Sequence, residues 1–173
     1  MRRLMLLRHA KALPAEGYAD IDRPLSAQGL AAAKAIGDFM AKKGLNPDLA
    51  LVSTARRTAE TWNLVATSLS MPAIRHDPLF HLASAETLFE TIQGTAPERN
   101  SVLVVGHNPG MEQLARGLAG SGAADALRRL RAKFPTATLA VIDFEASNWQ
   151  QIAPQSGRLA IFVTSADVMA GKQ

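Results

Sequence analysis

Short, mostly apolar runs recur along the chain, and the first of them ends abruptly in charged residues. They cover residues 4–7, 48–52, 101–105, 136–144 and 158–163, and residues 71–78 form a further short extended piece. Short, mostly apolar runs of this kind are typical of strands that are buried on both faces of a sheet. We therefore interpret them as the strands of one central sheet.

Between these runs, apolar residues recur at the spacing of a helix. After Ser26, a favourable N-cap residue, the pattern continues to Gly44, which is placed to end the helix. Further helices are predicted at residues 55–69, 84–92, 109–118 and 123–133, the last after a break at glycines 120 and 122. Strands alternating with helices predict an α/β fold, a three-layer sandwich with a central, largely parallel sheet flanked by helices.

The composition is that of one ordinary globular domain. The 173 residues are 47% hydrophobic, and no repeat, linker or change of composition marks a boundary, so we expect a single domain over residues 1–173. There is no cysteine. This excludes disulfides, thiolate metal sites and enzymes with a cysteine nucleophile, and it fits a reducing compartment.

The charge and hydropathy of the chain indicate which kinds of substrate and partner it can bind. Lys and Arg number 19 against 15 Asp and Glu, a net charge of +4 that suits anionic substrates. The apolar run at residues 4–7 is followed by Arg8, His9 and Lys11, and it is shorter than the roughly 7–15 residues of a signal peptide's apolar region. We expect a cytoplasmic protein with no membrane partner. The sequence favours no particular oligomeric state.

The candidate catalytic residues follow three of the predicted strands. His9 follows the first strand, next to Arg8, and His107 follows the strand at residues 101–105. Residues 53–57 (STARR) follow the strand at residues 48–52. Ligands of such folds bind outside the carboxyl ends of the strands, so we expect these side chains to meet in one crevice.

Those residue types suit phosphoryl transfer. Guanidinium groups bind phosphoryl oxygens, a neutral imidazole can attack phosphorus, and a second, protonated imidazole can stabilise the transition state. The helix after Pro109 could add backbone N–H donors, and no metal is required. Each residue alone also has a plainer interpretation. A histidine at a strand end can be structural, and Arg56 or Arg57 can be a solvated charge on a first helical turn.

Four segments resemble the histidine phosphatase superfamily, which has the phosphoglycerate mutase-like fold. Residues 6–11 (LLRHAK) resemble its arginine-histidine signature, and residues 22–26 (DRPLS) with Gly29 resemble the segment that follows. Residues 53–61 (STARRTAET) resemble its Ser-Pro-x-x-Arg block, and residues 106–109 (GHNP) its second-histidine motif. The small size and the Arg-His-Ala-Lys form resemble the SixA-like branch of phosphohistidine phosphatases.

The resemblance implies catalytic roles. His9 would be the nucleophile that becomes phosphorylated, and Arg8, Arg57 and His107 would bind the phosphoryl group. Arg57 is preferred to Arg56 because it holds the fifth position of its block. Ala10 and Thr54 depart from the glycine and proline that are usual in the superfamily, and neither touches this chemistry.

A general acid is less clearly indicated. Glu86 is the nearest candidate, although a carboxylate in the first turn of a helix is the favoured interpretation. An imidazole leaving group needs little acid assistance, so the lack of an acid favours phosphohistidine over a sugar phosphate. His76 and His81 have poor spacing for a metal and are interpreted as surface or loop residues.

A basic cluster follows at residues 128–133, which include Arg128, Arg129, Arg131 and Lys133. We favour a solvated helix face, with a dock for an acidic protein or another anion as the alternative. Nucleic-acid binding is disfavoured, because only 5% of residues are aromatic and few could stack on bases.

The sequence therefore predicts a metal-independent phosphatase without cofactors that acts through His9 on a phosphohistidine-bearing protein. Two rival functions remain. One is hydrolysis of a small phosphate ester with Glu86 as the acid, and the other is non-catalytic binding of phosphate or a phosphoprotein. Whether Lys11 joins the pocket is open.

Overall fold

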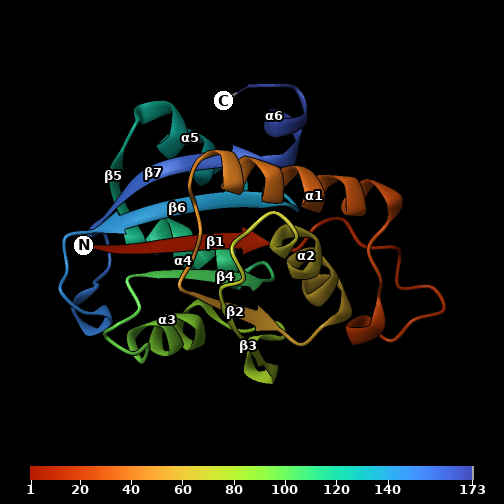
Figure 1. Ribbon diagram of the computed structural model, residues 1–173, viewed down its shortest axis with the longest axis horizontal. Coiled ribbons are helices and arrows are strands. Elements are labelled where there is room, and N and C mark those ends of the chain that lie inside the picture. Colours follow the sequence, from red (N-terminus) through yellow and green to blue (C-terminus); the bar gives the residue numbers. More distant parts are fainter. Residues whose placement is uncertain (173) are drawn as a thin grey trace.

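A seven-stranded sheet forms the centre of the computed structural model, which describes residues 1–172 (Figure 1). The strands are β1 (Arg2–Arg8), β2 (Leu49–Ser53), β3 (Ala73–Asp77), β4 (Ser101–Gly106), β5 (Ala119–Gly122), β6 (Thr138–Phe144) and β7 (Gly157–Thr164). Their order in the sheet is β3-β2-β4-β1-β6-β7-β5. Only β6 is antiparallel to its neighbours, so the predicted, largely parallel sheet is confirmed.

Helices cover both faces of this sheet. They are α1 (Ala27–Lys42), α2 (Arg56–Ala66), α3 (Ala85–Gln93), α4 (Gly110–Leu118), α5 (Ala124–Ala132) and α6 (Ser165–Met169), with 3-10 turns η1 (Asp20–Asp22), η2 (Pro78–Phe80) and η3 (Trp149–Gln151). One face carries α1, α2 and α6, and the other carries α3, α4 and α5. The three-layer α/β sandwich is therefore confirmed. No helix of residues 1–172 is long and apolar enough to cross a bilayer.

The continuous apolar run of β1 follows from its place in the middle of the sheet. Leu4 and Leu6 pack into the core on the α3–α4 side, while Met5 and Leu7 pack into the core on the α1–α2 side. All four are fully buried. Because successive side chains of a strand point to opposite faces, a strand covered on both faces needs apolar residues at every position.

Two elements differ from the prediction. The glycines at 120 and 122 lie in β5, an edge strand with three exposed residues, rather than in a simple chain break. A Cβ at Gly120 would lie 1.8 Å from the carbonyl oxygen of Gln155, so close approach explains this glycine. The short helix α6 was also not predicted. A capping box between Thr164 and Asp167 starts it.

The first turn of α1 packs directly against the chain that leaves β1. Ser26 caps the helix and donates from its backbone N–H to the carbonyl oxygen of Lys11, at 2.9 Å. A Cβ at Gly29 would lie 2.1 Å from that same oxygen. The glycine thus lets α1 fix the backbone two residues after His9.

We expect Gly29→Ala to lower the free energy of unfolding by about 1–3 kcal/mol, because the added methyl group must push α1 away from Lys11. Thermal and urea unfolding measure this change. Gly117→Ala is the matched control, since it lies in α4 with nothing within 4 Å of its Cβ position. That variant should gain about 0.5–1 kcal/mol from helix propensity. Equal stability of the two variants would contradict the packing argument.

Candidate active site

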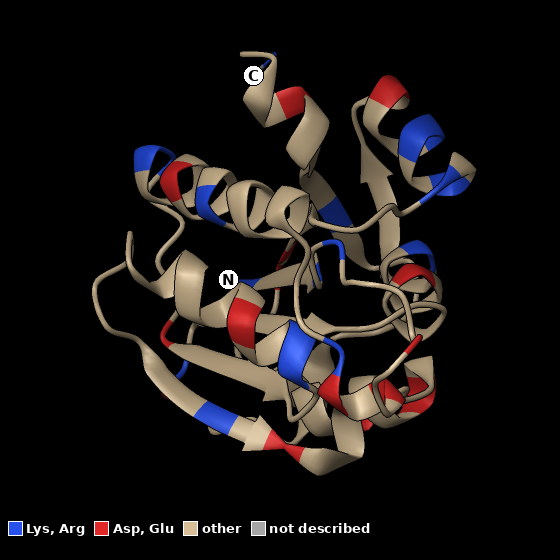
Figure 2. Cartoon of the chain, turned by 90° about the vertical axis from the view of Figure 1, so that its right-hand side faces the viewer, with Lys and Arg blue, Asp and Glu red and all other residues tan. Residues whose placement is uncertain are grey.

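The carboxyl ends of β2, β4 and β1 lie side by side, because these strands are neighbours in that order. His9 directly follows β1, His107 directly follows β4, and Ser53 ends β2. Arg57 comes from the first turn of α2. Figure 2 looks onto this edge of the sheet. The ring centroids of His9 and His107 are 5.2 Å apart, so the two predicted site histidines lie together.

His9 is buried, and its ring is held in one orientation. Nδ1 lies 2.8 Å from the carbonyl oxygen of Ala10. Because a carbonyl oxygen only accepts, Nδ1 carries the proton, and Nε2 of the neutral ring keeps its lone pair. Burial lowers the pKa of His9 to about 4, against the opposing effect of the Ala10 carbonyl, and the cations of Arg57 and Arg8 lower it further. The ring is a neutral imidazole at neutral pH, as a nucleophile requires.

His107 is also buried and neutral. Burial, and then the proximity of His9, lowers the pKa of His107 to about 3. Its Nε2 lies 2.7 Å from Oγ of Ser53, and its Nδ1 is buried without a hydrogen-bond partner. When the Ser53 hydroxyl donates to Nε2, the ring proton resides on Nδ1. A neutral His107 can then donate this proton to an anion, so the protonated form considered from the sequence is not required.

The two neighbouring arginines of α2 have different surroundings. The side chain of Arg57 is 3% exposed. Its Nη1 donates to the backbone oxygen of Asp20 at 2.6 Å, and its Nη2 to Oδ2 of the same residue at 3.1 Å. Arg56 instead forms a 2.7 Å ion pair with Glu60 on the helix surface. Arg57 is therefore the arginine of this block that belongs to the site.

Arg8 approaches from the end of β1. Its Nη1 donates to the carbonyl oxygen of Phe134 at 3.0 Å, and that oxygen also accepts from the Asn108 side chain. Burial lowers the pKa of Arg8 from its high ordinary value, with Glu112 opposing and Arg57 adding to this effect. An arginine remains charged after such a shift. The site therefore holds two guanidinium cations.

Unpaired donors gather at this site. Six buried side-chain nitrogen or oxygen atoms of residues 1–172 have no hydrogen-bond partner, and Arg8 Nε, Arg57 Nε and His107 Nδ1 are three of them. Buried polar atoms nearly always have a partner, so three unpaired donors on residues of one site indicate a place for an anionic ligand. Residues 1–172 contain no group of three His, Cys, Asp or Glu side chains placed to hold a metal ion.

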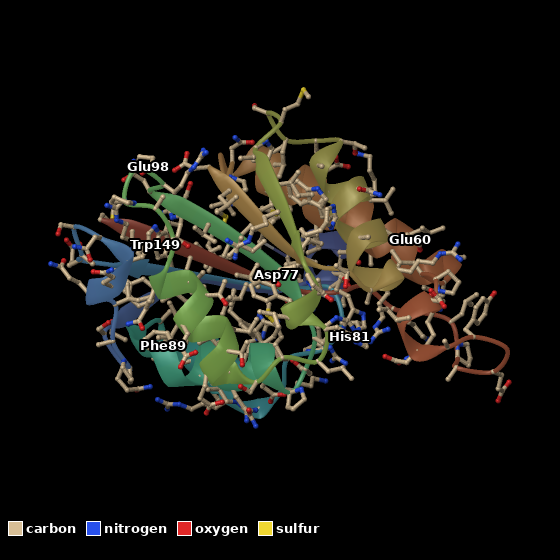
Figure 3. All side chains as sticks on the ribbon, turned by 90° about the horizontal axis from the view of Figure 1, so that it is seen from below. Glu60, Asp77, His81, Phe89, Glu98 and Trp149 are labelled. Atoms are coloured by element: carbon tan, nitrogen blue, oxygen red, sulfur yellow. The ribbon has the colours of Figure 1, made fainter. Side chains whose placement is uncertain are left out.

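Two further residues join the site that the sequence analysis did not place there. The ring centroid of His81 lies 5.5 Å from that of His107. Its Nε2 lies 3.1 Å from Oδ2 of Asp20. Hydrogen bonds from His81, and then from Arg57 and Arg23, lower the pKa of Asp20 to about 2. Figure 3 labels His81 on the segment that follows β3, so its position after a strand of the same sheet was the available signal.

Glu86 and Lys11 have other partners. Glu86 is exposed in the first turn of α3, where hydrogen bonds from its own backbone N–H and from Ser84 lower the pKa of its carboxyl group. It lines a groove between α3 and α4 together with Phe89 and Gln113. Lys11 donates to Oε1 of Gln28 at 2.9 Å. Both arrangements are those of surface side chains.

The basic cluster lies on α5, at the rim of the edge seen in Figure 2. Arg128 pairs with Asp125, and Arg129 pairs with Asp167. Arg131 and Lys133 are exposed. Half of the cluster therefore has carboxylate partners within the chain, and the solvated helix face stays a prediction.

Known proteins resemble this chain in sequence and in structure. Residues 4–84 match the model of the histidine phosphatase superfamily (branch 1). An uncharacterised protein of Mycobacterium tuberculosis is 34% identical over 158 residues, which cover 90% of this chain and 98% of that protein. The putative phosphohistidine phosphatase SixA from Agrobacterium tumefaciens is 35% identical, with a TM-score of 0.80 and coverage of 94% of this chain and 97% of that one.

A second solved structure agrees with the first. The putative phosphohistidine phosphatase SixA from Nakamurella multipartitia is 26% identical, with a TM-score of 0.81 and coverage of 94% of this chain and 95% of that one. The similarity thus extends well beyond residues 4–84 and includes the segment around His107. The chain belongs to the histidine phosphatase superfamily.

Proposed function

We propose that the protein is a metal-independent phosphatase that removes phosphate through a phosphohistidine intermediate on His9, and that its substrates are phosphohistidine residues of cytoplasmic proteins. The observation that carries this proposal is the neutral His9 imidazole beside three unpaired buried donors. A nucleophile and an anion cradle in one place are the two requirements of transfer to the enzyme.

In the first step, Nε2 of His9 attacks phosphorus as the bond to the leaving group breaks. The leaving group departs with the bonding electron pair and takes up a proton. Arg8, Arg57 and Nδ1–H of His107 bind the phosphoryl oxygens, where negative charge gathers in the transition state. Arg57 would bind the incoming phosphoryl group and Asp20 at the same time, because its Nη2 already donates a hydrogen bond to Oδ2 of Asp20.

In the second step, water attacks the phosphorus of phosphohistidine 9. The bond from phosphorus to Nε2 breaks, its electron pair returns to the ring, and inorganic phosphate leaves after the water has lost a proton. The same three donors hold the phosphoryl oxygens in both steps. The Ala10 carbonyl keeps the proton on Nδ1 throughout, so Nε2 is again the free nucleophile after each turnover.

The substrate class rests on the relatives and on leaving-group chemistry. The two structures described above are named as putative phosphohistidine phosphatases, and one of them is 35% identical to this chain. A phosphohistidine side chain leaves as imidazole, which needs less protonation than an alkoxide. Comparing kcat/KM for a phosphohistidine protein with kcat/KM for sugar phosphates tests this assignment. Clear preference for the sugar phosphates would contradict it.

The neutral state of His9 and His107 predicts how their NMR ring signals depend on pH. Since the pKa values of His9 and His107 are lowered to about 4 and about 3, each ring takes up its second proton only around those pH values. We expect their NMR ring signals to stay constant from about pH 8 down to about pH 5.5, where an ordinary histidine titrates. His9→Ala and His107→Ala spectra assign the signals. Titration of either ring near pH 6.5 would show that burial does not control its charge.

A further inference from the structure

The proposed reaction needs a proton for its leaving group, and the residue that would supply it is not Glu86. The Glu86 carboxylate is exposed and bonded at the start of α3. An alkoxide leaving group must be protonated as its bond to phosphorus breaks, so a group at the site mouth would have to act.

We propose that His81, oriented by Asp20, donates the proton to the leaving group, and that the site thereby hydrolyses phosphate monoesters of ordinary alcohols as well as phosphohistidine. This inference rests on the proposed function, because it requires phosphoryl transfer to His9.

The position of His81 fits this role. The three rings form a series, with 5.2 Å between the centroids of His9 and His107 and 5.5 Å between those of His107 and His81. His9 and His107 are buried, whereas the side chain of His81 is 26% exposed. In-line displacement places the leaving group opposite the nucleophile. A leaving group expelled by the buried His9 therefore departs toward solvent, and His81 is the most exposed of the three rings.

Asp20 holds the His81 ring. Its Oδ2 lies 3.1 Å from Nε2, and because a carboxylate only accepts, Nε2 carries a proton. The carboxylate is itself fixed by Arg57 at 3.1 Å and by Arg23 at 3.3 Å. With Nε2 bonded to Asp20, Nδ1 is the ring nitrogen left to face the leaving group, and the proton that His81 donates is the one carried on Nδ1.

The proton balance closes over the two steps. As the bond between phosphorus and the leaving oxygen breaks, that oxygen keeps the electron pair and receives the Nδ1 proton, which leaves His81 neutral. When water attacks phosphohistidine 9, neutral His81 accepts a proton from the water through Nδ1. The hydroxyl oxygen bonds to phosphorus, the bond from phosphorus to Nε2 of His9 breaks, and His81 regains its starting state.

Leaving-group dependence tests the proposal. Acid catalysis matters in proportion to the basicity of the leaving group. We expect His81→Asn to lower kcat/KM about 100-fold with glycerol 2-phosphate, and less than about threefold with p-nitrophenyl phosphate or free phosphohistidine. The ratio between these substrates is the readout, because a general loss of phosphate binding would lower all of them together. His76→Asn, on the exposed part of β3, is the matched control and should leave the ratio unchanged.

Asp20→Asn provides a second variant. It retains the backbone oxygen that binds Arg57 but removes the carboxylate charge beside His81. Because Asp20 positions His81, Asp20→Asn should also lower kcat/KM for glycerol 2-phosphate relative to kcat/KM for p-nitrophenyl phosphate. The expected decrease is about tenfold, smaller than that of His81→Asn.

Each other outcome contradicts the proposal. An equal loss on all substrates in His81→Asn would make His81 a structural residue of the pocket, and an unchanged ratio would exclude it as the donor. A parent enzyme that cleaves phosphohistidine but no alkyl ester would overturn this inference and leave the proposed function standing. A parent enzyme inactive on every phosphate would overturn both.

Discussion

Replacing His9 by alanine is expected to lower turnover by at least about 1,000-fold, because the variant has no atom that can accept the phosphoryl group. Rapid quench with a labelled phosphodonor measures this directly. The parent protein should carry an acid-labile, alkali-stable label on residue 9, and the variant should carry none. Since the anion-binding donors come from other residues, binding of inorganic phosphate should change by less than about threefold.

The matched control for this experiment is His76→Ala. His76 lies exposed on β3, so its removal should leave both turnover and labelling unchanged. Equal activity of His9→Ala and the parent would end the nucleophile assignment. Phosphate binding by a parent that neither turns over nor takes up label would instead indicate a non-catalytic phosphate-binding module.

Much of this site could be predicted from the sequence, because it is built at strand ends. A strand buried on both faces of a parallel sheet is mostly apolar, so the polar residues at its end mark the point where the chain leaves the sheet. His9 and His107 each occupy that point. Carboxyl ends of parallel strands lie at one edge, and therefore two residues distant in sequence were expected at one place.

The same reasoning explains why β5 was missed. It is an edge strand of mostly exposed small residues, and exposed edges impose no apolar pattern. Glycines at such a position read as a turn, whereas Gly120 is required by the approach of Gln155. The pairing of β5 with β7 depends on long-range packing that no local signal encodes.

Asp20 and His81 were missed for a related reason. Asp20 lies in a polar loop without periodicity, and its contacts with Arg57 and His81 join residues 37 and 61 positions apart. Side-chain contacts of this range are set by the final packing of loops against the sheet edge. The spacing of His81 from His76 indicates only a poor metal site, whereas its position shortly after β3 is what brings it to the edge of the sheet.

Arg57→Ala is expected to lower kcat/KM by about 100- to 1,000-fold, because a buried guanidinium that binds the transferring group contributes most when charge develops on it. Arg57→Lys should recover only part of this loss, since an ammonium group lacks the planar fork. Steady-state kinetics measure the losses. Thermal unfolding must accompany them, because Arg57 also fastens the Asp20 loop through two hydrogen bonds.

Arg56→Ala is the sharpest control, because it removes the same side chain one position earlier in the same helix. Arg56 is bonded to Glu60 on the surface, and its loss should change kcat/KM by less than about twofold and leave the unfolding temperature nearly unchanged. If Arg56→Ala were the more damaging change, the phosphoryl group would have to be bound outside the cradle of His9, His107 and Arg57. A large loss confined to Arg57 would tie activity to the guanidinium that reaches the buried histidines.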